Sequence, residues 1–213
     1  MEKKKNISMA VIKRLPKYHR YLKELMRNDV DRISSKELGE KIGFTASQIR
    51  QDLNCFGDFG QQGYGYNVRE LTNQISLILG LNKQYKAVIV GAGNIGQAIA
   101  NYKFNKLGFE YIGIFDANPK LIGMKMQEVE IRDIDTLKEY LKDNKVDIGC
   151  ICVPRINAQK VCDELIHGGV KGIWNFAPVD LIVPEGVTVE NVHLSESLLT
   201  LIYLLHNKQE EEQ

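Results

Sequence analysis

The residues with the clearest chemical meaning form a glycine-rich loop after a short apolar run. The stretch Lys86-Ala-Val-Ile-Val-Gly91-Ala-Gly93-Asn94-Ile-Gly96 leads an apolar strand into the pattern G-x-G-x-x-G. In that setting the first glycine permits a tight turn, the second lets a pyrophosphate approach the backbone, and the third lets the next helix pack closely. The N-terminus of that helix favours anions. The residues predicted to cradle a dinucleotide are Gly91, Ala92, Gly93, Asn94, Ile95 and Gly96.

An acidic residue follows at the spacing that ribose recognition requires. A second apolar run, Tyr111–Phe115, ends in Asp116, which lies 20 residues beyond Gly96. A carboxylate at this position accepts a hydrogen bond from a free 2′-hydroxyl and repels a 2′-phosphate. The spacing therefore favours NAD(H) over NADP(H).

Apolar runs and helical patterns keep alternating through 147–153, 156–167 and 172–176, which is typical of a Rossmann-type open parallel sheet. Because ligands bind at the carboxyl ends of parallel strands, we expect a second group of residues near the nicotinamide ring. Plain loop and helix packing is the alternative for Tyr102, Pro154 and Asn175. The full group is Tyr102, Val153, Pro154, Asn175, Phe176, Ala177 and Pro178.

No catalytic set accompanies this site in the sequence. The histidines, at 19, 167, 193 and 206, do not stand beside a carboxylate in a proton-relay motif, and fewer than 40 residues follow Pro178. The four cysteines lack paired C-x-x-C spacing, so no metal site is predicted. An apolar pocket penalises the positive charge of the oxidised ring, which favours a sensor over an enzyme. An NAD(H)-dependent oxidoreductase and a CoA-binding or nucleotide-binding module remain the alternatives.

The segment before the glycine loop has a different character. Residues 1–85 hold 15 Lys and Arg against 9 Asp and Glu, a net charge of +6, whereas the remainder carries 13 against 18, or −5. Two capping-box patterns, Ser34-x-x-Glu37 and Thr45-x-x-Gln48, flank a turn at Gly43-Phe44. This arrangement predicts a helix-turn-helix, with an upstream helix carrying core residues at Ile12, Leu15, Leu22, Leu25 and Met26.

The second of these helices has the pattern of a DNA-reading helix. Ala46, Ile49, Leu53 and Phe56 share a buried face, and the opposite face is polar. The stretch Gly57–Tyr66 has four glycines and three aromatic residues, as expected of a β-ribbon wing. An ordinary solvated face is the alternative for the helix alone. The predicted DNA-binding residues are Ser47, Gln48, Arg50, Gln51, Asn54, Phe59, Gly63 and Tyr64.

The last apolar segment predicts a dimer. Ser195 is a plausible N-cap for a helix over 196–207, whose six leucine and isoleucine residues cover nearly the whole circumference. Such a helix needs a partner, so we expect it to insert into a second copy of the chain as a swapped element, followed by an acidic tail. The longest apolar run is too short to span a bilayer and no signal peptide is visible, which predicts a cytoplasmic protein.

Taken together, the motifs resemble the Rex family of redox-sensing transcriptional repressors. The resemblance rests on Ser34-Ser-x-x-Leu-Gly39, on Gln48-Ile-Arg-x-Asp-Leu-x-x-Phe-Gly-x-Phe-Gly60, on Gly65-Tyr66, on the glycine loop with Asp116, and on Asn175-Phe-Ala-Pro178. It implies a homodimer that binds operator DNA with inverted-repeat half-sites when NAD+ predominates and leaves it when NADH binds. The domains expected are a winged helix over 1–84, a Rossmann domain over 85–192 and a swapped helix over 193–213.

Two residues depart from the pattern that the resemblance implies. Gln51 stands where many family members have lysine on the groove-facing surface, so the operator preference is expected to differ. His193 stands where some relatives have an acidic residue that pairs with an arginine of the first helix, here Arg20. An imidazole cannot replace that carboxylate, so we expect other contacts to couple the nucleotide to the DNA-binding units.

Overall fold

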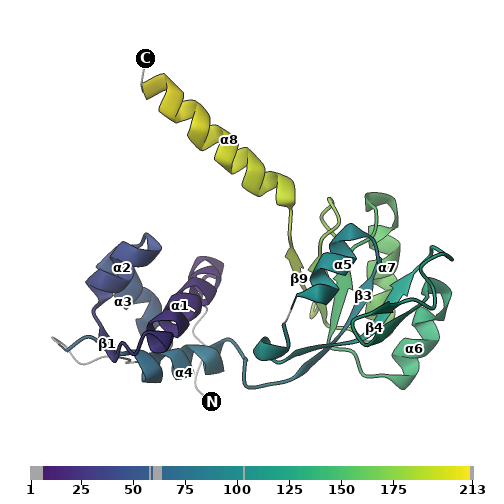
Figure 1. The fold of residues 1–213 in the computed structure, drawn as a ribbon, viewed down its shortest axis with the longest axis horizontal. Helices are drawn as coiled ribbons and strands as arrows, with labels where there is room; N and C mark the ends of the chain where they lie inside the picture. The colour runs from purple at the N-terminus through teal and green to yellow at the C-terminus, as the bar shows by residue number, and fades with distance from the viewer. Residues whose placement is uncertain (1–6, 58, 60–63, 103, 212–213) are drawn as a thin grey trace. The chain divides into compact units, whose positions relative to one another are not determined.

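The computed structural model describes residues 7–57, 59, 64–102 and 104–211. These residues form two compact units, one ending at Lys83 and the other beginning at Gln84 (Figure 1). Across the described residues, no helix combines the length and the apolar character needed to cross a membrane.

The first unit is a helical domain with a small sheet. Its helices are α1 (Met9–Arg27), α2 (Ser35–Ile42), α3 (Ala46–Asn54) and α4 (Val68–Ile78), and its sheet pairs β1 (Arg32–Ile33) with β2 (Tyr66–Asn67) in antiparallel fashion. The helix α4 and the strand β1 were not predicted. The core gathers Leu15, Tyr18, Leu22, Leu38, Ile49, Leu53 and Leu71.

The predicted helix-turn-helix is confirmed in its local details. The Ser34 hydroxyl accepts from the Glu37 N–H while the Glu37 carboxylate accepts from the Ser34 N–H, which completes the first predicted capping box. At the second, the Thr45 hydroxyl accepts from the Gln48 N–H, which is one of the two bonds of such a box. Gly43 ends α2 with φ of 78°, the left-handed conformation that glycine adopts without strain. The prediction for Ile12 was wrong: its side chain is 39% exposed, because α1 turns that position toward solvent.

A short neck closes the helix-turn-helix region. Ile33 pairs with Tyr66, Arg32 pairs with Asn67, and the Val68 N–H donates to the Asp31 carbonyl at 2.9 Å. Gly65 has φ of 70°, and a Cβ there would lie 2.7 Å from the Ile33 carbonyl oxygen. Glycine is therefore required at the point where the two chain segments approach most closely.

The second unit is built on a seven-stranded sheet in the order β5-β6-β4-β3-β7-β8-β9. The strands are β3 (Tyr85–Val90), β4 (Phe109–Asp116), β5 (Lys125–Met126), β6 (Val129–Asp133), β7 (Ile148–Ile151), β8 (Gly172–Asn175) and β9 (Thr188–Asn191). The helices are α5 (Asn94–Asn101), α6 (Leu137–Asp143) and α7 (Arg155–His167), with short 3₁₀ turns at Phe104–Leu107 and Ile134–Thr136. The predicted open parallel sheet is confirmed, with the short edge strand β5 added antiparallel to β6.

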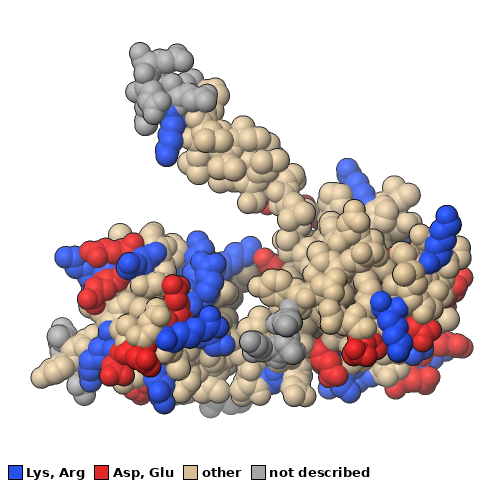
Figure 2. All heavy atoms as spheres, viewed as in Figure 1, with Lys and Arg blue, Asp and Glu red and all other residues tan. Residues whose placement is uncertain are grey.

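The last helix, α8, spans Leu194–Glu211. It begins before Ser195, so the prediction of Ser195 as its N-cap was wrong, and Glu210 and Glu211 belong to it and not to a separate tail. Its surface is uncharged along most of its length (Figure 2). The side chains of Leu198, Leu199, Leu201, Ile202, Leu204 and Leu205 are 50–62% exposed.

Candidate functional site

The glycine loop lies at the carboxyl end of β3, where the chain turns into α5. Gly91 has φ of 100°, and a Cβ there would meet the Cys152 carbonyl oxygen at 2.5 Å. A Cβ on Gly96 would lie 1.9 Å from the Gly91 carbonyl oxygen, so the first turn of α5 packs directly on the loop. Gly93 faces open space and caps α5. The loop thus leaves its backbone and a helix N-terminus accessible to a phosphate.

Asp116 closes one side of the loop. Its Oδ2 accepts from the Ala92 N–H at 2.6 Å, and its Oδ1 accepts from the Asn118 N–H at 2.7 Å. A carboxylate offers about four acceptor positions, so two bonds leave capacity for a hydroxyl. The Asp116 side chain is therefore fixed in orientation and still able to accept from a ribose.

A pocket of about 750 Å³ opens beside this loop, within the range typical of small-molecule sites. Nine of the residues predicted to bind the dinucleotide line it: Gly91, Gly93, Asn94, Ile95, Asp116, Val153, Pro154, Phe176 and Pro178. Sequence reasoning did not single out Ile134, Asp135 and Lys138, which follow β6, or Asn157, Lys160, Val161 and Glu164 of α7. They lie outside any motif, and only the order of the strands brings them to this edge.

The other predicted residues lie outside the lining of this pocket. Ala92, in the loop itself, and Gly96, in the first turn of α5, are both buried. Tyr102 ends α5, is 64% exposed, and stacks at 4.3 Å on Phe104 beside a different hollow. The Asn175 side chain is fully buried.

Asn175 has a structural position in place of the predicted ligand contact. Its amide donates to the Val179 carbonyl at 2.7 Å and to Asn191 Oδ1 at 2.9 Å, and its Oδ1 accepts from the Ala177 N–H at 3.0 Å. Ala177 is likewise buried. These bonds shape the loop that presents Phe176 and Pro178 to the pocket.

Part of the pocket lining, directly after β7, is uncharged. Cys152 belongs to this part, and burial raises the pKa of that thiol to about 12, so the group stays neutral at physiological pH. Together with Val153, Phe176 and Pro178 it forms an apolar part of the pocket lining. Such a lining favours a neutral ring over a cationic one.

His193 is paired with a carboxylate that the sequence did not indicate. Its Nε2 lies 3.2 Å from Asp180 Oδ1, and Asp180 also accepts from the Asn191 amide at 3.1 Å. Thirteen positions separate the two residues in the chain, so no local motif reveals the pair. Neither of them lines the pocket beside the glycine loop.

Five of the predicted DNA-binding residues lie on α3. Ser47, Arg50, Gln51 and Asn54 are exposed, and Gln48 is half-buried. The Arg50 guanidinium donates to the Ser35 hydroxyl at 2.8 Å, which ties the start of α2 to α3.

The predicted wing is only partly described. Tyr64 is 71% exposed, with the Arg32 guanidinium 5.9 Å from its ring centroid. Phe59 packs against the core, and Gly63 lies outside the described residues. Within the described part of the chain, no group of His, Cys, Asp and Glu side chains has the arrangement of a metal site.

Comparison with known proteins places this pair of sites in a family. A family described as "Putative DNA-binding protein N-terminus" matches residues 6–54, and one described as "CoA binding domain" matches residues 82–179. The redox-sensing transcriptional repressor Rex of Clostridium botulinum is 75% identical over 209 residues, covering 98% of this chain and all of the relative. The chain belongs to the Rex family.

A second Rex protein and two solved structures are also similar to this chain over almost its full length. Rex of Clostridium tetani is 74% identical over 212 residues, covering 99% of this chain and all of the relative. The structure of RSP in complex with β-NAD+ and operator DNA is 59% identical with a TM-score of 0.90, covering 97% of this chain and 95% of that one. RSP in complex with β-NADH is 56% identical with a TM-score of 0.91, covering 97% and 98%.

Proposed function

We propose that this Rex family protein is a homodimeric transcriptional repressor that binds operator DNA and is released from it when NADH binds. The observation that carries this function is the presence, on one chain, of a dinucleotide pocket beside Asp116 and a polar reading face on α3. The solved RSP structures, with NADH in one and with NAD+ and operator DNA in the other, support the same pair of ligands.

The residues of the pocket divide by chemistry. Gly91, Gly93 and the α5 N-terminus would hold the pyrophosphate, and Asp116 would accept from the adenosine ribose. The apolar part of the lining formed by Cys152, Val153, Phe176 and Pro178 would receive the nicotinamide ring, where a neutral reduced ring costs less to bury than a cationic oxidised one.

The residues of α3 divide in the same way. Ser47, Gln51 and Asn54 would read base edges in the major groove, while Arg50 and the wing residue Tyr64 would contact the backbone or groove wall. Two such units in a dimer would grip half-sites one helical turn apart. The proposed domains are 1–84, 85–192 and 193–213, the last providing the swapped helix, and the site of action is the cytoplasm.

The switch itself is a population shift. Binding of NADH favours a dimer state in which the two reading helices no longer match successive major grooves, so DNA and NADH oppose each other reciprocally. Fluorescence anisotropy of a labelled operator, titrated with protein in the absence and presence of NADH, tests this. The affinity for the operator should fall when NADH is added and should stay unchanged when NAD+ is added. If NADH leaves the affinity unchanged, the proposed function is refuted.

A further inference from the structure

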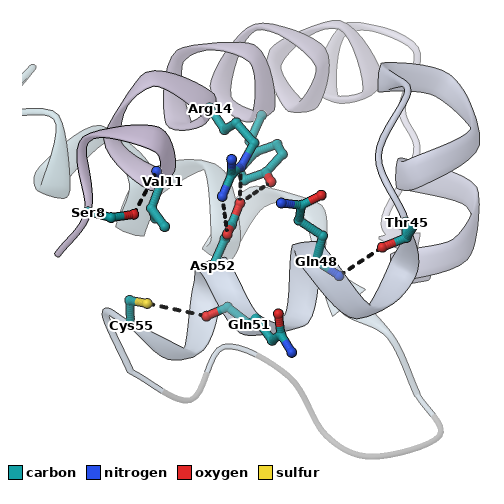
Figure 3. A network of polar contacts seen from close by, with 9 residues as sticks. Ser8, Val11, Arg14, Thr45, Gln48, Gln51, Asp52 and Cys55 are labelled. Atoms are coloured by element: carbon teal, nitrogen blue, oxygen red, sulfur yellow. Dashed lines mark hydrogen bonds and ion pairs between the residues drawn. The ribbon is translucent and has the colours of Figure 1, made fainter.

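One side chain of α3 takes no part in the reading face. Asp52 follows Gln51 in the chain, yet it is 3% exposed and points toward α1, whereas Gln51 points away on the other side of the helix (Figure 3). The Asp52 carboxylate accepts from Arg14 Nε at 2.6 Å, from Arg14 Nη2 at 2.7 Å and from the Tyr18 hydroxyl at 2.5 Å. Both donors belong to α1, so three hydrogen bonds tie the recognition helix to it.

The geometry of this link is directional. Arg14 Nη2 donates to Oδ1 and Nε to Oδ2, the bidentate arrangement in which a planar guanidinium meets a planar carboxylate. The apolar neighbours Ile49 and Leu53 also hold α3, but such contacts have no preferred angle. A side-chain tip about 5 Å from the helix axis moves about 1 Å when the helix turns by about 10°, which is enough to spoil a base contact.

The turn before α3 depends on the same two donors. The Arg14 guanidinium lies 5.8 Å from the centroid of the Phe44 ring, and the Tyr18 ring meets Phe44 edge-on at 6.0 Å. Phe44 immediately precedes Thr45, the N-cap of α3. Arg14 and Tyr18 therefore hold the recognition helix both at its start and at Asp52.

A buried ion pair is a poor means of stabilising a core, since the loss of hydration offsets the attraction between the charges, but it defines one geometry well. We propose that Asp52 is a positioning residue that fixes the rotation of α3, so that Ser47, Gln51 and Asn54 meet base edges. This role rests on the proposed DNA-binding function of that face.

Because Asp52 pairs with a charged residue, its replacement should affect specific and non-specific DNA binding differently. Arg14 is 17% exposed and its charge is matched by Asp52. Replacing Asp52 with asparagine would leave the Arg14 charge unmatched in a DNA-binding unit. Non-specific binding depends on positive charge and would hold or increase, while specific binding would fall because the reading residues are displaced.

The experiment uses the full-length protein and two duplexes of equal length and composition. One is an operator that the wild-type protein selects from a randomised library, and the other is its scrambled sequence. Asp52→Asn should lower the ratio of operator to scrambled affinity about tenfold or more, with scrambled affinity unchanged or higher. Tyr18→Phe removes one of the three bonds and should lower the ratio less.

Ile75→Val is the matched control. Ile75 is fully buried on α4, so its truncation lowers the stability of the same unit without touching the link between α1 and α3. Its affinity ratio should equal that of the wild type, and circular dichroism at the assay temperature reports the folded fraction of each variant. Should Asp52→Asn fail to fold, Tyr18→Phe decides the question.

Two results would overturn the role of Asp52. Equal losses on both duplexes would show that the network only maintains the folded fraction, and unchanged ratios in both variants would show that α3 keeps its rotation without it. If the wild-type protein selects no preferred sequence from the library, the DNA-binding function is refuted, and with it the role of Asp52.

Discussion

Removal of α8 should convert the dimer to monomers. The change is a chain that ends at Leu194, without residues 195–213. In the wild-type chain α8 carries six aliphatic side chains around its circumference, each about half exposed: Leu198, Leu199, Leu201, Ile202, Leu204 and Leu205. Such a surface is stable in water only when a partner covers it.

The magnitude follows from these exposures. Complete burial of a leucine or isoleucine side chain contributes about 1.5–3 kcal/mol, so side chains that are already half buried gain about 1 kcal/mol each on dimerisation. Six of them give about 6 kcal/mol per helix and about 12 kcal/mol for a symmetric pair, against an association cost of about 4–15 kcal/mol. Even a net loss of about 5 kcal/mol weakens dimerisation by more than about a thousandfold.

Sedimentation velocity at micromolar concentration measures the outcome directly. The wild-type protein should sediment as a dimer and the truncated chain as a monomer. Leu201→Ala serves as a graded control, because it removes one buried side chain per helix and should weaken the dimer without abolishing it. A truncated chain that still sedimented as a dimer would refute the assignment of α8 to the interface.

Three further predictions concern single residues. Asp116→Asn should weaken NADH binding about tenfold or more, since a hydrogen bond to a charged group contributes about 1.5–3 kcal/mol, and should narrow the preference over NADPH; calorimetry showing both affinities unchanged would contradict this. Gln51→Lys should change base preference at one position per half-site by about 1–3 kcal/mol, and an identical profile on a randomised operator library would rule it out. Burial lowers the pKa of His19, and the positive charge of nearby Lys23 lowers it further. His19 therefore takes up a proton more readily in the unfolded chain than in the folded protein. Its contribution to folding stability is fully present above the pKa of the unfolded state and is lost as the pH falls below that value. The wild-type protein should therefore lose melting temperature between pH 7.5 and pH 5.5, whereas His19→Gln should not, so the advantage of the wild type over the variant should shrink. A difference in melting temperature that stays constant over this range would show that His19 does not link stability to pH.

Local chemistry made much of the fold predictable. The caps at Ser34 and Thr45, the left-handed Gly43 and the glycine loop each depend on a few neighbouring residues, so their patterns survive in one sequence. The starts of helices with strong caps were placed well. The start of α8 was not, because Ser195, a residue type typical of N-caps, lies inside the helix, which begins at Leu194 directly after the His193–Asp180 pair.

Contacts between distant parts of the chain were not predictable. Asn175 follows a strand at the ligand edge, where sequence reasoning placed its amide in the pocket, but Asn191 and Val179 compete for that amide and draw it into the core. Asp52 had no predicted role beyond its place in the family motif, since nothing local reveals that Arg14 lies against it. Pairing energies between remote side chains decide such cases, and a single sequence does not display them.

The neck formed by β1 and β2 closes the segment that carries the reading surface. Pairing of Ile33 with Tyr66 closes a loop of 32 residues that contains α2 and α3. Closing a flexible loop of that size costs about 3 kcal/mol of chain entropy, more than two short strands repay alone. The remainder comes from packing on α1 and α4, so the closed neck and the place of the reading helix depend on that packing. A side chain at Gly65 would force the neck apart and so release both ends of the segment that carries the reading helix.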